Sequence, residues 1–164
     1  MMRVIQKIIQ FTLLIAAIDI CAIASIAQKP AVSTRTSSQM ETLESSLRKQ
    51  AAAGDGLATA FIEKYPQYYT QLIVRTKSGE VEIHQRFDEM AIVLDGHATV
   101  FTGGNPQNVR VVRPGEQRAS TAPGGTPTAM AKGALLYIPV GTPHKVIVPQ
   151  GGFVAYLDVK IAHP

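Results

Sequence analysis

The sequence predicts an all-β fold, a small sandwich or barrel of antiparallel strands preceded by a short helical segment. Two observations predict it. Near residue 70 the apolar periodicity changes from helix-like to strand-like. Beyond that point, short runs rich in β-branched and aromatic residues alternate with turn-forming Gly, Pro, Asn and Asp. The 164 residues leave room for one domain and a targeting segment.

The N-terminus has the order of a secretory signal peptide. Arg3 and Lys7 precede an almost wholly apolar stretch that ends in Ser-Ile-Ala before Gln28. The alternative is a membrane anchor, because the apolar stretch approaches the length that spans a bilayer. Asp19 within the stretch and the small residues at its end favour cleavage. We therefore expect residues 1–27 to be removed, leaving an exported protein, periplasmic or secreted, with no stable membrane span.

Charge and cysteine content limit the kinds of partner. The formal net charge is +4, but Lys and Arg are scattered and form no basic run interleaved with aromatic residues. We therefore expect no nucleic-acid partner. Cys21 is the only cysteine and would leave with the signal peptide, so the mature protein would have neither a disulfide nor thiol chemistry. Its fold would then depend on its hydrophobic core.

Residues 28–70 are predicted to form a flexible leader and short helices. The first helix is expected over residues 38–53, where Ser38 and Glu41 have the spacing of a capping box and a glycine follows the last helical residue. A second short helix is expected over residues 57–64, just before a proline.

Residues 71–164 are predicted to form the β-domain. Asp95-Gly96 is a strong hairpin-turn signal between two of its apolar runs. Residues 103–125 are rich in Gly, Pro, Thr and polar residues, and are most simply a surface insertion with one strand. A lid over the mouth of the barrel is the alternative. The expected strands cover residues 71–76, 81–85, 90–94, 98–101, 109–112, 135–138, 145–148 and 153–161.

Four residues with metal-binding side chains lie on or beside these strands. Glu82 and His84 are two apart, so on a strand they point to the same face. Glu89 opens the next apolar run, where an inward carboxylate needs a partner such as a metal ion. With His144 they offer two imidazoles and two carboxylates, which nearly cancel the charge of a divalent ion. We predict one ion of Mn, Fe, Ni or Zn, and no structural zinc site, which normally uses cysteine.

Each of these residues also has a structural explanation. His84 alone could be a hydrogen-bonded barrel histidine, and Glu82 would face water if the register slipped by one residue. His144 follows a Gly-Thr-Pro segment and could cap its turn. The alternative to a metal site is therefore a metal-free polar pocket in the same place.

The spacing of these residues resembles two signature motifs of the cupin superfamily. The first reads G-x5-H-x-H-x(3,4)-E-x6-G. Glu82, His84, Glu89 and Gly96 follow it, with Glu82 in place of the first histidine. Thr76 stands where the motif has its leading glycine.

The second motif is matched more fully. It reads G-x5-P-x-G-x2-H-x3-N. Gly133, Pro139, Gly141 and His144 keep its spacing, and Val148 replaces its asparagine. That asparagine is not a metal ligand in the family, so the replacement concerns local hydrogen bonding.

The resemblance covers about residues 72–161 and implies the cupin fold, an antiparallel β-barrel or jelly roll with the metal in its interior. It does not fix a reaction, because the family includes dioxygenases, isomerases, decarboxylases, epimerases and non-catalytic binding or storage proteins. Two functions remain. The first is a metal-dependent enzyme acting on a small oxygen-rich molecule, an organic acid, sugar derivative or enolisable carbonyl compound. The second is a non-catalytic module that binds a small ligand. No catalytic residue is assigned, and Arg75, Tyr137 and Tyr156 are candidate pocket groups.

A homodimer is expected from strands that are apolar on both faces. Met90, Ile92 and Leu94 lie between the inward positions of their strand and are also apolar, as are Val154 and Tyr156 in a later strand. Both faces of such a strand must be covered. A second copy would cover the outer face, and a second sheet or the N-terminal helix could do so within one chain.

Overall fold

The structure is a computed structural model that describes residues 32–163. The expected signal peptide lies outside the described residues. Within residues 32–163, no helix has both the length and the apolar character that crossing a membrane requires.

Helix α1 covers Ser37–Ala53. The strands that follow are β1 (Leu57–Lys64), β2 (Tyr68–Arg75), β3 (Val81–His84), β4 (Phe87–Thr102), β5 (Arg110–Arg113), β6 (Glu116–Ala119), β7 (Thr126–Ala131), β8 (Leu135–Ile138), β9 (His144–Ile147) and β10 (Val154–Ala162).

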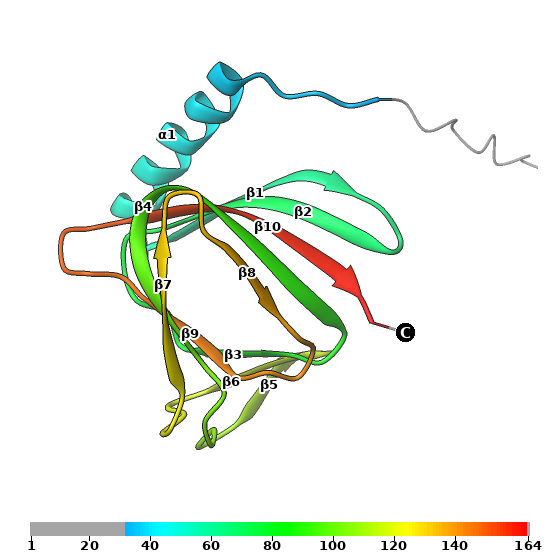
Figure 1. The fold of residues 1–164 in the computed structure, drawn as a ribbon, viewed down its shortest axis with the longest axis vertical. Helices are drawn as coiled ribbons and strands as arrows, with labels where there is room; N and C mark the ends of the chain where they lie inside the picture. Colours follow the sequence, from blue (N-terminus) through cyan, green and yellow to red (C-terminus); the bar gives the residue numbers. More distant parts are fainter. Residues whose placement is uncertain (1–31, 164) are drawn as a thin grey trace, which may run out of the picture. The chain divides into compact units, whose positions relative to one another are not determined.

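The strands form one antiparallel sheet that curls around an interior (Figure 1). Its order is β1-β2-β10-β4-β9-β3-β6-β5, and β7 and β8 also pair with β4. The first half of β4 pairs with β10 and β8, and its second half pairs with β7 and β9. One long strand therefore belongs to both walls. The predicted all-β class, an antiparallel barrel with a short N-terminal helix, is confirmed.

Strand β4 bends at Gly96 without ending there. The sequence predicted a hairpin turn at Asp95-Gly96, and this prediction is wrong. Gly96 has a φ of +71°, and a Cβ at this position would lie 2.2 Å from the carbonyl oxygen of Phe153. The pairing of β4 with β10 shifts register beside it, between Ala155 and Tyr156. A left-handed glycine and a bulge bend the strand from one wall of the barrel into the other.

The second helix expected over residues 57–64 is also wrong, because this segment is strand β1 and pairs with β2 from Leu57 onward. One face of the strand packs in the cluster beneath α1, and this packing together with the pairing to β2 outweighs the helix propensity of its Ala, Leu, Glu and Lys residues. Ala58, Ala60 and Ile62 lie on that face, whereas Leu57, Thr59 and Phe61 border the cavity on the other face and stay exposed.

Helix α1 confirms the expected first helix but not its expected cap. Thr36, not Ser38, is the N-cap, and its hydroxyl accepts a hydrogen bond from the Gln39 amide at 3.3 Å. The Gln39 side chain in turn accepts one from the Thr36 amide at 2.8 Å. Gln39 therefore completes the capping box that was assigned to Glu41. Gly54 ends the helix, as expected.

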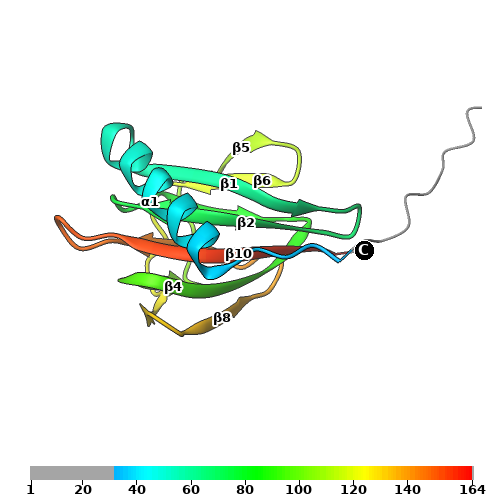
Figure 2. The same cartoon turned by 90° about the horizontal axis from the view of Figure 1, so that it is seen from above.

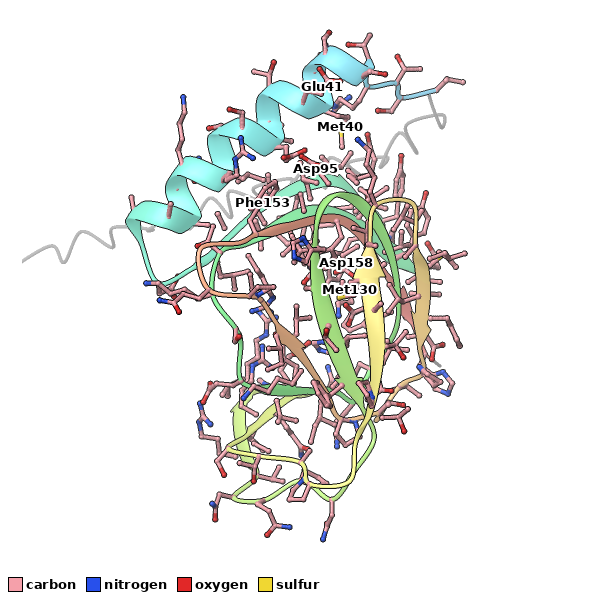
Figure 3. The ribbon with its side chains drawn as sticks, turned by 60° about the vertical axis from the view of Figure 1, so that its left-hand side comes forward. Met40, Glu41, Asp95, Met130, Phe153 and Asp158 are labelled. Atoms are coloured by element: carbon pink, nitrogen blue, oxygen red, sulfur yellow. The ribbon has the colours of Figure 1, made fainter. Side chains whose placement is uncertain are left out.

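Helix α1 covers the outer face of the sheet, where it lies across β1, β2 and β10 (Figure 2). Buried Leu47 and Leu72 belong to one apolar cluster, and Leu94 of β4 and Phe153 pack against this cluster. Phe153 is labelled in Figure 3. Part of the outer apolar face that suggested a homodimer is therefore covered within the chain. Tyr156, with Val154, belongs to the inner core and not to this outer face.

Residues 103–125 include paired strands rather than only a surface insertion. Strand β6 pairs with β3 through Val81↔Ala119 and His84↔Glu116, and β5 pairs with β6. Only the strand over residues 109–112 was expected here. The segment therefore extends the sheet beside His84 and brings Glu116 to it.

Candidate metal centre

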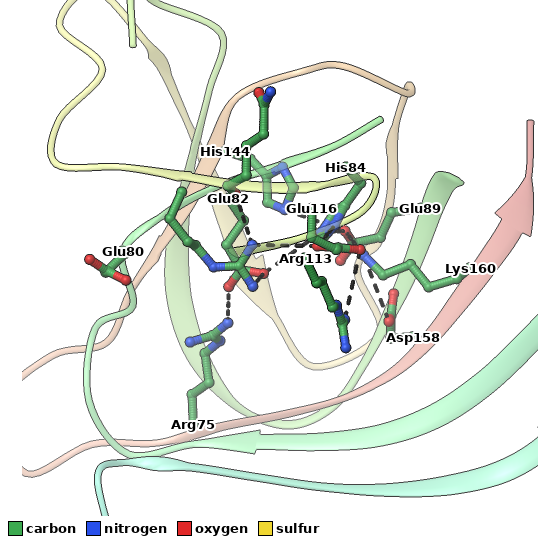
Figure 4. A network of polar contacts seen from close by, with 12 residues as sticks. Arg75, Glu80, Glu82, His84, Glu89, Arg113, Glu116, His144, Asp158 and Lys160 are labelled. Carbon is green, nitrogen blue, oxygen red and sulfur yellow. Dashed lines mark hydrogen bonds and ion pairs between the residues drawn. The ribbon is translucent and has the colours of Figure 1, made fainter. Parts of the chain in front are cut away.

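All four residues from which the sequence predicted a metal site line one cavity of about 300 Å³ inside the barrel (Figure 4). Glu82 and His84 come from β3, Glu89 from the start of β4, and His144 from the start of β9. The pairing of Glu82 with His144 joins the two sequence motifs in space. His84, Glu89 and His144 are each less than 8 % exposed, which is rare for such groups unless they have partners.

The turn before His144 is tied directly to the first motif. The amide of Gly141 donates a hydrogen bond to the carbonyl oxygen of His84 at 2.7 Å. Gly141 has a φ of +76°, a conformation that glycine adopts without strain. The amide of Thr142 donates to the oxygen of Pro139 at 3.1 Å and closes the turn. The Pro-x-Gly spacing thus sets where His144 enters the cavity.

The donor atoms lie close enough to share one ion. Nε2 of His84 and Nε2 of His144 are each 3.3 Å from Oε2 of Glu89. Oε2 of Glu82 is 3.7 Å from Nε2 of His84, and donor atoms of Glu82, His84 and His144 all lie within 4.8 Å of one another. Two atoms that are each about 2.1 Å from one ion lie roughly 3.0 to 3.4 Å apart. The two contacts at Oε2 of Glu89 have this spacing, Glu82 lies somewhat farther from His84, and the donor types suit a divalent transition metal.

Both histidines present Nε2 to this point. Nδ1 of His144 is 3.0 Å from the carbonyl oxygen of Thr142, which can only accept, so Nδ1 carries the proton. Nδ1 of His84 is 2.7 Å from Oε2 of Glu116. Among the described residues, Nε2 of His84 is buried without a hydrogen-bond partner, and it lies 3.3 Å from Oε2 of Glu89. Acceptors that fix the far nitrogen in this way orient metal-binding histidines.

The carboxylates of the site are held in their ionised form. Burial raises the pKa of Glu82, but the charges of Arg75 and Arg118 outweigh it, and the pKa is lowered. Burial likewise opposes ionisation of Glu89, whose pKa lies well below its ordinary value because of the two histidines and Lys160. Ionised carboxylates are the form that binds a metal.

The pKa of His84 moves the other way. Burial lowers it, but the hydrogen bond to Glu116 and the contact with Glu89 outweigh burial and raise it above its ordinary value. A metal ion at this imidazole would therefore compete with a proton.

Each glutamate of the site also contacts a cation of the protein. Arg75 donates a hydrogen bond to Oε1 of Glu82, and Arg118 lies 3.4 Å from its Oε2. Lys160 donates to Oε2 of Glu89, the oxygen that both histidines face. Sequence reasoning missed Glu116, Arg118 and Lys160. For Lys160 a signal existed, since period two places it on the same face of β10 as Tyr156 and Asp158.

Asp158 is fully buried beside this network. Its Oδ2 accepts a hydrogen bond from Nε2 of Gln71 at 2.7 Å and lies 4.0 Å from Nζ of Lys160, while Oδ1 has no hydrogen-bond partner. Burial, reinforced by the charge of Glu89, raises the pKa of Asp158 to about 7. An unpaired buried carboxyl oxygen favours the protonated acid.

Of the other candidate pocket groups, two line the cavity and one does not. Nε of Arg75 donates to the hydroxyl of Tyr156 at 3.3 Å, and both residues line the cavity. Tyr137 is 58 % exposed on β8, outside the cavity lining.

No family model matches this chain, and no curated protein matches it. Solved structures with a similar fold include the cupin-2 domain of Rru_A2000 from Rhodospirillum rubrum, with 12 % identity, 66 % of this chain and 61 % of that chain covered, and a TM-score of 0.48. The polyketide cyclase RemF from Streptomyces resistomycificus has 14 % identity over 66 % and 68 %, with a TM-score of 0.48. KdgF from Halomonas sp. has 14 % identity over 68 % and 84 %, with a TM-score of 0.48. The strand pairing within this chain, and not this similarity, establishes the barrel.

Proposed function

We propose that this chain is an exported cupin-type barrel protein that binds one divalent transition metal through Glu82, His84, Glu89 and His144. One observation carries the proposal. Both histidines direct Nε2 to within 3.3 Å of the same oxygen of Glu89, while their Nδ1 atoms lie against acceptors. The two cupin-like motifs supply all four residues. The donor set suits Mn, Fe, Ni or Zn.

The chemistry follows from the arrangement of the residues. A bound ion with four protein ligands keeps positions free to polarise an oxygen of a small molecule. Glu116 orients His84, and the carbonyl of Thr142 orients His144. Arg75 holds the remaining oxygen of Glu82. We propose a metal-dependent enzyme acting on a small oxygen-rich molecule, an organic acid, sugar derivative or enolisable carbonyl compound.

The alternative is a non-catalytic module that binds a small ligand in the same cavity. One observation favours it: Arg75 and Arg118 contact Glu82, Lys160 contacts Glu89, and Arg118 also lies 3.4 Å from Glu116. Such a pocket is electrostatically balanced by its own side chains. Turnover of a substrate by loaded but not by chelator-treated protein would decide for the enzyme.

Elemental analysis of protein purified without chelator tests the metal site. We expect about one metal ion per wild-type chain, and loss of metal in His84→Ala and His144→Ala, since each removes a nitrogen donor. Glu82→Ala should weaken binding less, because Arg75 already shares that carboxylate. His97→Ala is the matched control, a histidine that is exposed and lies outside the cavity. Full occupancy in both site variants would contradict the proposal.

Export is proposed on the N-terminal sequence alone. N-terminal sequencing of exported material should begin at Gln28 or within a few residues of it. An intact chain that keeps Met1 in the membrane fraction would contradict cleavage.

A further inference from the structure

Arg75, Arg118 and Lys160 contact the glutamates of the candidate metal centre, and two of these cations contact the same glutamate oxygens that face the histidines. Oε2 of Glu89 faces both histidines and accepts from Lys160. Oε2 of Glu82 lies 3.7 Å from Nε2 of His84 and 3.4 Å from Arg118. Arg75 contacts the other oxygen of Glu82. Metal and cations therefore compete for the same two atoms.

The charges of the site indicate what a metal ion would bring with it. Among the described residues, the cavity lining holds three glutamates and four cations: Glu82, Glu89 and Glu116 with Arg75, Arg113, Arg118 and Lys160. A divalent ion would add two positive charges to a lining that already has more cationic than anionic side chains, in a place where unpaired charge is costly. The loaded cavity therefore favours an anionic ligand.

The position of Arg118 makes it the partner for that anion. Its side chain is 21 % exposed, whereas those of Arg75 and Lys160 are at most 8 % exposed. Arg113 is 68 % exposed and also lines the cavity, but it lies 3.8 Å from Glu116, which is not one of the proposed metal ligands, so an ion would not release it. Arg75 is also held at Nε by the hydroxyl of Tyr156. Once Oε2 of Glu82 turns to an ion, the NH2 group of Arg118 loses its contact with that oxygen and faces the cavity. A guanidinium presents paired donors that match a carboxylate.

The size and walls of the cavity limit the anion. A volume of about 300 Å³ is at the small end of ligand pockets. Its apolar wall, which borders the core, suits a short carbon chain: Val100, Met130, Leu136, Ile138 and Val146. A small dicarboxylate has both an end for the ion and an end for Arg118.

We propose that the metal-loaded cavity binds a small dicarboxylate, with one carboxylate on the ion and the other on Arg118, and that metal and dicarboxylate strengthen each other's binding. This inference rests on the proposed metal site and names the ligand class for it. In the metal-free protein the glutamates pair with these cations, so the dicarboxylate site forms only when the ion draws the glutamate oxygens away. Coupling of this kind is reciprocal, so the ligand must raise metal affinity by the factor by which metal raises ligand affinity.

Calorimetric titration of succinate into Mn²⁺-loaded and chelator-treated wild-type protein tests the coupling. Succinate binds such ions only weakly in free solution, and succinamide is its uncharged counterpart of equal length. We expect succinate to bind the loaded protein at least about tenfold more tightly than the metal-free protein, as coupling energies between sites usually give. Succinamide should show no such difference. In the reverse titration, succinate should tighten Mn²⁺ binding by the same factor.

Arg118→Gln tests the residue. It should weaken succinate binding to loaded protein about 10- to 100-fold, since it removes a charged hydrogen bond. Its Mn²⁺ affinity without succinate should stay equal to or above that of wild type, because a competitor for Glu82 is gone. Arg110→Gln is the control, since Arg110 pairs with Glu80 on the surface and lies outside the cavity lining. Thermal unfolding of both variants checks that they fold.

The outcomes separate this inference from the proposed function. If the protein binds no metal, both fail. If it binds metal but succinate binds loaded and metal-free protein equally, or neither, the metal site stands and the dicarboxylate inference is wrong. If folded Arg118→Gln binds succinate as wild type does, the assignment of Arg118 is wrong.

Discussion

Lys160 holds the oxygen of Glu89 that both histidines face, so its ammonium group occupies the atom to which the proposed metal ion would bind. Lys160 is 4 % exposed, and the carboxyl of Asp158 lies 4.0 Å from its Nζ as a second partner. Removing one member of a buried ion pair leaves the other without compensation. A cation bound at Glu89 would supply that compensation.

Lys160→Met is therefore expected to raise metal affinity by about tenfold or more. Without the ammonium group, Glu89 attracts the ion more strongly, and each 1.4 kcal/mol gained in this attraction is a factor of ten in affinity. Competition with a chromophoric chelator measures it. The metal-free variant should be less stable than wild type, by about 3–5 kcal/mol as for other broken buried pairs. Lys132→Met, on the exposed surface, is the control and should change neither quantity. Unchanged or weaker metal binding in Lys160→Met would show that the ammonium does not compete.

At the residue scale, the sequence predicted what local spacing can reveal. Glu82 and His84 share a strand face, and the Pro-x-Gly turn places His144, so motif spacing located all three residues. Glu116 and Lys160 reach the site only through the pairing of β6 with β3 and of β10 with β4. No short-range pattern records such pairings. Their role as ligands or partners of a metal stays a prediction.

At the scale of elements, the errors have one origin, since tertiary packing overrode local propensity. Residues 57–64 contain good helix formers but form β1, because β2 pairs with the segment and α1 covers its Ala58, Ala60 and Ile62 face. Asp95-Gly96 was predicted to form a hairpin turn, and Gly96 does have the positive φ that such turns use. This glycine lies in a bend of β4 and not in a hairpin turn. The pairing of β4 with β10 determines which of the two forms.

Gly96→Ala tests whether this bend holds the barrel closed. A positive φ alone costs about 1–3 kcal/mol in a residue with a Cβ. Here the Cβ would also lie 2.2 Å from the oxygen of Phe153, which accepts the hydrogen bond of the His97 amide at 2.9 Å. Gly151 has nearly the same φ, +72°, with nothing within 4 Å of an added Cβ, so Gly151→Ala isolates the backbone cost.

Urea unfolding of both variants measures the difference. Gly96→Ala should lose clearly more stability than Gly151→Ala, and the excess is the cost of moving β10 away from β4. Equal losses would mean that the Phe153 backbone yields freely, and that the bend is not a fixed part of the barrel.

At the scale of the whole molecule, the apolar surface that remains exposed bears on assembly. Leu47 of α1 covers part of the outer face of the sheet, but Phe61 is 59 %, Leu135 is 64 % and Tyr137 is 58 % exposed. Contiguous apolar patches on soluble proteins commonly mark interfaces. The homodimer therefore stays a prediction. Light scattering at micromolar concentration should give twice the chain mass, and a monomer mass would contradict it.

The pH dependence of stability should report the buried charges together. Asp158 has its pKa raised to about 7 from an ordinary value of 3.8, so the folded state holds a proton that the unfolded chain releases. The stability that this proton gives the folded state is fully present below pH 3.8 and is lost as pH rises through about 7. The pKa of His84 is also raised in the folded state. Its stabilisation is fully present below pH 6.5 and is lost as pH rises through the higher folded pKa. The pKa values of Glu82 and Glu89 are lowered in the folded state, so the stability that these carboxylates provide is fully present above pH 4.5 and is lost in acid.

Chelator-treated protein should therefore be most stable at about pH 5 and lose stability steadily towards pH 8, because proton release on unfolding then favours the unfolded chain. Thermal midpoints measured across this range check it. Asp158→Asn keeps the size and neutrality of the protonated acid, so it should flatten much of the fall. Saturating metal should oppose the fall, since metal affinity grows as protons leave the histidines. A wild-type midpoint that rises from pH 5 to 8 without metal, or a fall that Asp158→Asn leaves unchanged, would show that Asp158 is ionised inside the folded barrel.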